Sequence, residues 1–176
     1  SPETEAAAAR YPRIRLFRAM HRVAEYAFDD LYGTPWAECR PETVADFSAV
    51  GYHFGRNLQE KLNVPIGLIQ IAWGGTPIDS WTSLGALTSD ASLMPALAEW
   101  ARVMREYPDE RLRYHQAAKR WEAAAAKAKA AGIKHAEPVP ERPVIGPAGP
   151  WRPGSIFNGM VAAATPSPIR GVIWYQ

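Results

Sequence analysis

Cysteine is nearly absent from this sequence, since Cys39 is the single cysteine among 176 residues. One cysteine excludes an internal disulfide, and no converging group of histidines accompanies it to make a metal site. We therefore expect no metal site at this cysteine, and interpret Cys39 as a small apolar residue of the core.

Long apolar runs and an excess of one charge are also missing. No run approaches the roughly 20 apolar residues of a membrane-spanning helix, and the start SPETEAAAAR does not read as a signal peptide. The formal net charge is +2, with basic and acidic residues interspersed. The composition therefore predicts neither a nucleic-acid nor a membrane partner, and it leaves the compartment unknown.

A nucleophilic serine motif is a further absence. The chain contains no GDS, GQS or GxSxG block and no Asp-x-x-His block. Ser80 follows an aspartate but has no histidine near it in sequence, so we interpret it as a structural hydroxyl. The four histidines, His21, His53, His115 and His135, carry no metal-ligand spacing.

What the chain does contain is the pattern of an α/β domain. Hydrophobic residues make up 47% and charged residues 22% of the sequence, enough apolar surface for a sizeable core in one domain. The runs 14–17 and 66–73 are predicted strands, the second buried on both faces. Between them, 18–40 reads as a loop or hairpin, and an amphipathic helix runs from Pro41 to Asn63. Strand, helix and strand predict a βαβ unit.

Residues from about 90 to 135 have helical periodicity, which predicts an insertion. Pro108 divides the segment, so we expect two helices packed as a helical hairpin, closed by Gly132. Residues from about 137 to 154 are rich in proline and predict an extended connector with polyproline character.

The segment 66–82, IGLIQIAWGGTPIDSWT, carries the strongest functional signal. Its apolar strand leads into Gly74 and Gly75, and then into a predicted helix start with Thr76 as N-cap, Pro77 at the first helical position and Asp79 completing a capping box. Free backbone N–H groups at the carboxyl end of a strand would suit an oxyanion. The alternative interpretation is a purely structural turn.

Several motifs resemble one family in order and spacing. They are PETV, DFSAVGY, NVPIGLI, WGGTPI, FNGM and RGVIWYQ, spread over the chain outside about 80–150. Together they resemble the sialate O-acetylesterase family of SGNH-type hydrolases. The resemblance implies that residues 1–176 form part of one SGNH hydrolase domain, a three-layer α/β fold with a flavodoxin-like parallel sheet. It also implies removal of O-acetyl esters from sialic acid or a related glycan, without a metal, a nucleotide or another cofactor, in a periplasmic or secreted setting.

The resemblance also implies functional residues. The family's Gly-Gln-Ser-Asn and Asp-x-x-His blocks do not occur here, so the nucleophile and base are expected from another segment of the same esterase. This chain would supply the oxyanion hole, through Gly75 or, as second choice, Gly74. Asn158 either caps a short helix or lines the cleft. The residues expected to bind the acetylated carbohydrate are Asn158, Trp151, Arg152 and Gln176.

The resemblance predicts the order of the strands as well. In a sheet of order 2-1-3-4-5, the segments 14–17, 66–73 and 171–176 would be strands two, three and four. A strand from elsewhere would then fill a gap between 14–17 and 66–73. Two other functions remain open: acetyl ester hydrolysis on plant xylan or xyloglucan, and noncatalytic glycan binding or assembly.

Overall fold

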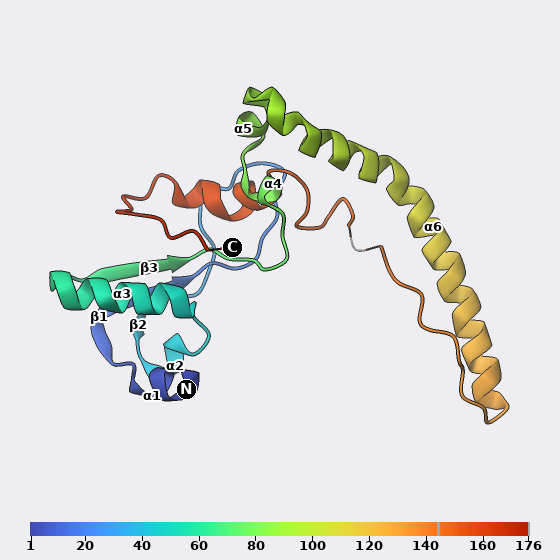
Figure 1. Cartoon of the computed structure of the whole chain (residues 1–176), viewed down its shortest axis with the longest axis horizontal. Helices are drawn as coiled ribbons and strands as arrows, with labels where there is room; N and C mark the ends of the chain where they lie inside the picture. Colours follow the sequence, from blue (N-terminus) through green and yellow to red (C-terminus); the bar gives the residue numbers. More distant parts are fainter. Residues whose placement is uncertain (144, 176) are drawn as a thin grey trace. The chain divides into compact units, whose positions relative to one another are not determined.

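A computed structural model describes residues 1–143 and 145–175, in two compact units. The first unit comprises Ser1–Thr76 and Ser155–Gln176, and the second comprises Pro77–Gly154. The first contains a sheet with helices and the second is built around one long helix (Figure 1). The chain is therefore a mixed α/β protein, as the sequence predicts.

The first unit is organised around a three-stranded sheet in the order β2-β1-β3. The strands are β1 (Tyr11–Arg18), β2 (Ala37–Cys39) and β3 (Ile66–Gln70). β1 and β3 are parallel, with Ile14 opposite Ile66 and Arg18 opposite Gln70, whereas β2 is antiparallel to β1. Both predicted strands and the βαβ connection are confirmed, and β2 with the Ala19–Gly33 bridge makes the 18–40 segment hairpin-like.

The direct pairing of β1 with β3 contradicts the predicted strand order. Their register is continuous from Ile14 to Arg18 on one side and from Ile66 to Gln70 on the other. β2 occupies the opposite edge of β1, so both edges of this strand are paired. Because β1 and β3 pair directly, no gap remains between the two parallel strands, and the prediction of an intervening strand is wrong.

Three helices accompany the sheet: α1 (Pro2–Ala8), α2 (Pro41–Val44) and α3 (Ala49–Leu62). The predicted single helix is broken because Ser48 starts a new one, its Oγ accepting the Gly51 N–H at 3.2 Å. Asn63 ends α3 with a φ of 53°, as predicted. Tyr52 and Gly55 form its buried face, whereas the apolar residues Phe54 and Leu62 are 47% and 59% exposed.

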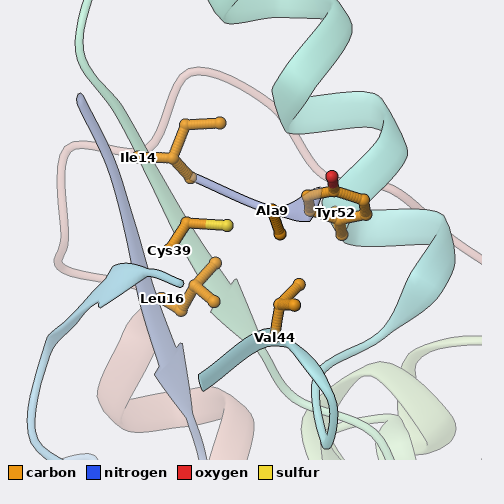
Figure 2. Close-up of a cluster of buried hydrophobic side chains, with 6 residues drawn as sticks. All are labelled: Ala9, Ile14, Leu16, Cys39, Val44 and Tyr52. Carbon is orange, nitrogen blue, oxygen red and sulfur yellow. The ribbon is translucent and has the colours of Figure 1, made fainter. Parts of the chain in front are cut away.

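The core of the first unit lies between the sheet and these helices (Figure 2). β1 contributes Ile14 and Leu16, alternate residues of one face, and α2 and α3 contribute Val44 and Tyr52. Cys39 is fully buried among them, which confirms its predicted role. Burying each large aliphatic side chain contributes about 1.5–3 kcal/mol, so this cluster fixes β1 and hence the ends of the parallel strands.

Two predicted features of the strands differ from the structure. β3 is half-buried rather than buried on both faces, and Gly67 is exposed, because β3 is an outer strand of the described sheet. Residues 171–175 form no strand and are exposed, so the prediction of a strand at 171–176 is wrong for this part. An extended segment becomes a strand only by pairing, and no described strand pairs with it. Gln176 lies outside the described residues.

The second unit starts with short helices and continues into one long helix. They are α4 (Ile78–Trp81), α5 (Leu84–Ser89), η1 (Ala91–Leu93) and α6 (Met94–Ala130), with 37 residues in α6. α6 continues through Pro108 (Figure 1), so the predicted helical hairpin is wrong. An internal proline costs a helix about 3 kcal/mol locally, but the strong helix formers on both sides resume the hydrogen-bond ladder.

The proline-rich connector, not a second helix, packs on α6. Trp121 Nε1 donates to the Glu137 carbonyl at 2.9 Å, and its ring meets His135 edge-on at 5.3 Å between centroids. Farther along, Gly146 lies so close to Tyr107 that a Cβ there would be 2.9 Å from the ring. The insertion is thus a helix with an extended chain folded back along it. None of the described helices, α6 included, combines the length and apolar character needed to span a membrane.

Candidate functional site

The carboxyl ends of β1 and β3 meet at one edge of the sheet. Just beyond β1, the Ala19 N–H donates to the Gln70 carbonyl at 2.9 Å. His21 follows on one side and Trp73 on the other, and their rings stack with centroids 4.2 Å apart and planes within 7°. His21 Nε2 is 2.9 Å from the Ala72 carbonyl, which can only accept, so Nε2 carries the proton. The stack joins the two strand ends.

The Gly74–Gly75 turn follows directly on this stack. Gly75 has a φ of +76°, the left-handed region in which a side chain is strained. Both glycines are exposed, and a Cβ added to either would meet no atom within 4 Å. The Thr76 hydroxyl closes the turn by donating to the Trp73 carbonyl at 2.7 Å. The turn therefore presents its backbone to the outside at the strand ends, where parallel sheets bind ligands.

The predicted helix cap after this turn is wrong. Thr76 uses its hydroxyl on Trp73, and the helix begins only at Ile78, with Pro77 as an N-cap that makes no side-chain bond. α4 has only four residues, so it supplies little macrodipole. An oxyanion at this place would rely on the N–H groups of the turn itself.

Asn158 lies inside the π-helical turn η2 (Phe157–Val161), which continues into η3 (Ala162–Ala164). Its amide does not cap a helix, so that interpretation is wrong. Instead Nδ2 donates to the Glu25 carbonyl at 2.8 Å, and the Asn158 carbonyl accepts the Phe28 N–H at 3.0 Å. These bonds hold the loop after His21 against η2.

The other expected site residues are distributed as follows. Trp151 and Arg152 are half-buried members of the second unit, at the end of the connector. Gln176 is outside the described residues. Their predicted roles in binding carbohydrate stay proposals.

The hydroxyl and thiol nucleophiles considered from sequence are occupied or buried. Ser80 is 0% exposed, and its Oγ donates to the Pro77 carbonyl at 2.7 Å. Burial raises the pKa of the Cys39 thiol, which keeps it protonated. Among residues 1–143 and 145–175, no three His, Cys, Asp or Glu side chains gather as a metal site would require.

Sequence reasoning missed the His21–Trp73 stack. The two residues are far apart in the chain, and the only available signal was that each follows a predicted parallel strand. Trp73 directly follows β3, whereas His21 belongs to the loop after β1.

Comparisons with known proteins find sequence similarity to carbohydrate esterases. No protein-family model matches it. The sialate O-acetylesterase of Rattus norvegicus is 29% identical over 175 residues, covering 96% of this chain and 29% of that protein. The human sialate O-acetylesterase is 26% identical and also covers 96% of this chain. A solved carbohydrate acetylesterase from Xanthomonas citri is 30% identical over 52% of this chain and 21% of its own, with a TM-score of 0.47.

The chain spans only 25–29% of the length of the curated relatives it matches. The aligned region covers 96% of this chain, so it includes the motifs on both sides of the insertion. The resemblance seen in the motifs is thereby confirmed: this chain is similar in sequence to the sialate O-acetylesterases.

Proposed function

We propose that the protein hydrolyses O-acetyl esters of sialic acid or a related glycan, as part of an SGNH-type three-layer hydrolase domain that includes residues 1–176. The observation that carries the proposal is the similarity to sialate O-acetylesterases across 96% of the chain. An exposed glycine turn at the ends of two parallel strands supports it, because such turns suit a backbone oxyanion site.

In the proposed reaction, a serine oxygen attacks the acetyl carbonyl while a histidine takes its proton. The tetrahedral oxyanion collapses, the sugar oxygen leaves with that proton, and water then releases acetate from the acyl-serine by the same steps. This chain contributes the Gly75 N–H, or secondarily that of Gly74, to the oxyanion. The glycines permit close approach because they lack a Cβ.

The nucleophile and base are proposed to come from another segment of the same esterase. Two observations support this. The curated relatives are three to four times longer than the matched region. Within this chain, Ser80 has its hydroxyl committed to a carbonyl and is inaccessible. No metal or nucleotide takes part in the proposed mechanism.

Carbohydrate binding is proposed for four residues. The Arg152 guanidinium matches the fork geometry of a sugar carboxylate, and the Trp151 ring offers an apolar face for a pyranose. Asn158 and Gln176 supply amides that can bond hydroxyl groups. The motifs FNGM and RGVIWYQ support the last two assignments.

The proposal is tested by measuring acetate released by the intact protein. The substrates are O-acetylated sialic acid and acetylated xylan, with the loss of each acetyl group followed by mass spectrometry. Preferential release from sialic acid is the expected result. Release from xylan alone would move the substrate to plant polysaccharide, and release from neither would contradict the esterase and favour noncatalytic glycan binding.

A further inference from the structure

The long helix α6 has one side covered by the connector. Tyr107, Tyr114, Trp121 and Ala128 recur every seven residues and form a single stripe. Trp121 bonds the connector at Glu137, Tyr107 contacts it at Gly146, and Ala128 is buried. Tyr107, Trp121 and Ala128 thus lie on the side that the returning chain covers, whereas Leu112 on another side is 57% exposed.

A row of cations occupies the uncovered surface. Arg113, Arg120 and Lys127 also recur every seven residues, and all three are exposed. We call these three residues the basic row. At 1.5 Å rise per residue, neighbouring members are about 10 Å apart along the axis, and the row extends for about 20 Å.

The surroundings of the basic row carry little compensating negative charge. Segment 111–134 contains seven lysines and arginines and one acidic residue, Glu122. The positions three and four residues from Arg120 and Lys127 hold only glutamine and alanine, so no acidic neighbour can pair with them along the helix.

The proximal part of the same helix is different. Arg102 binds Glu99 and Glu106, each at 2.6 Å, and these carboxylates neutralise it. Within the described residues, no salt bridge joins any member of the basic row to a carboxylate. The insertion therefore combines a neutralised proximal part with a distal part in which Arg120 and Lys127 have no acidic neighbour along the helix. Arg113, at the start of the row, follows Asp109 and Glu110, and its Nε donates to the Asp109 backbone carbonyl at 3.3 Å.

We propose that the basic row binds an acidic polysaccharide, with its guanidinium and ammonium groups on successive sugar carboxylates. Charge complementarity supports a polyanion, and arginine forks match carboxylates. The choice of a glycan rests on the proposed function. A membrane would require several bulky apolar residues on the exposed side, and among the described residues between 107 and 130 only Leu112 is a large apolar side chain that is exposed. Single-stranded nucleic acid would require exposed aromatic rings for stacking. The aromatic stripe of α6 lies instead against the connector.

The test compares two triple variants of the intact protein. The row variant is Arg113→Gln, Arg120→Gln and Lys127→Gln, which removes three charges while keeping good helix formers. The control variant is Arg10→Gln, Lys61→Gln and Arg170→Gln, which removes three exposed charges outside the insertion. Binding is measured by fluorescence anisotropy with a labelled linear polymer of sialic acid, with neutral dextran and a DNA duplex as comparison probes. Circular dichroism checks that α6 is retained.

We expect the row variant to bind the sialic acid polymer about 10- to 100-fold more weakly, at roughly 0.5–1 kcal/mol for each surface contact. The control variant should bind as the parent does, and added salt should weaken the parent. The proposal would be overturned if the row variant bound the sialic acid polymer as tightly as the parent does. It would also be overturned if the parent bound the DNA duplex more tightly than the polymer and the row variant lost that binding. Binding of the polymer does not require catalysis. If the protein binds through the basic row but releases no acetate, the proposed esterase function is contradicted and the proposed binding surface is not.

Discussion

Replacing Gly75 by valine probes the glycine turn directly. Gly75 has a φ of +76°, which a β-branched residue adopts only under strain. A residue held there costs about 1–3 kcal/mol, and relaxing φ toward negative values would turn the Gly75 N–H away from its present direction. Open space around the position means that the new side chain clashes with nothing, so the fold should survive.

Gly74→Val is the matched control. Gly74 also has open space for a Cβ but does not have a positive φ, so valine there imposes no such strain. We expect the melting temperature of Gly75→Val to fall by roughly 2–4 °C for each kcal/mol lost, and that of Gly74→Val to change little.

The rate of acetate release should also differ between Gly75→Val and Gly74→Val. Losing one oxyanion donor typically lowers turnover by about 100- to 1,000-fold. We expect a loss of this size in kcat for acetate release by folded Gly75→Val, with a much smaller loss for Gly74→Val. If both variants release acetate at the parental rate while Gly75→Val shows the expected destabilisation, the Gly75 N–H is not an oxyanion donor and the assignment fails.

Three further substitutions or reactions test the neighbouring structure. Ser80→Ala should retain parental acetate release and lose about 0.5–1.5 kcal/mol in chemical denaturation, because only the bond to Pro77 is removed; a loss of activity beyond about 1,000-fold would reveal a nucleophile. Gly159→Ala should destabilise the fold by about 1–3 kcal/mol, since its Cβ would be 2.3 Å from the Arg22 carbonyl oxygen, and an unchanged denaturation midpoint would show that the loop yields freely. Cys39 should resist a thiol reagent at pH 8 until the protein unfolds, because burial raises its pKa and lowers the thiolate fraction; rapid labelling of the native protein would contradict its place in the core.

The parts of the fold that follow local patterns were predictable from sequence. β1 and β3 are apolar runs with clear limits, and α3 ends at Asn63, where the sequence predicts the end of a helix. The buried role of Cys39 also followed from composition. These features depend on residues close together in the chain, which is why the sequence indicates them.

The features that were mispredicted depend on competition between alternative partners, which the local sequence pattern does not resolve. Pro108 reads as a helix boundary, yet the contacts of Tyr107 and Trp121 with the connector favour one continuous α6. Thr76 reads as a cap, but the nearby Trp73 carbonyl takes its hydroxyl.

The candidate site shows the same division. The Gly74–Gly75 turn was visible as a motif, whereas the His21–Trp73 stack requires β1 and β3 to be neighbours. Direct pairing of these strands was excluded by the predicted order, so the approach of the loop after β1 to the end of β3 was not foreseen.

The most direct test of the account is to locate the nucleophile of the intact protein. A fluorophosphonate that reacts with activated serines should block acetate release, and peptide mapping should place its single adduct on a serine outside residues 1–176. An adduct on Ser80 or on any other serine of this chain, or full acetate release from protein that carries no adduct after treatment, would contradict the proposal that this chain supplies the oxyanion turn to a nucleophile from another segment.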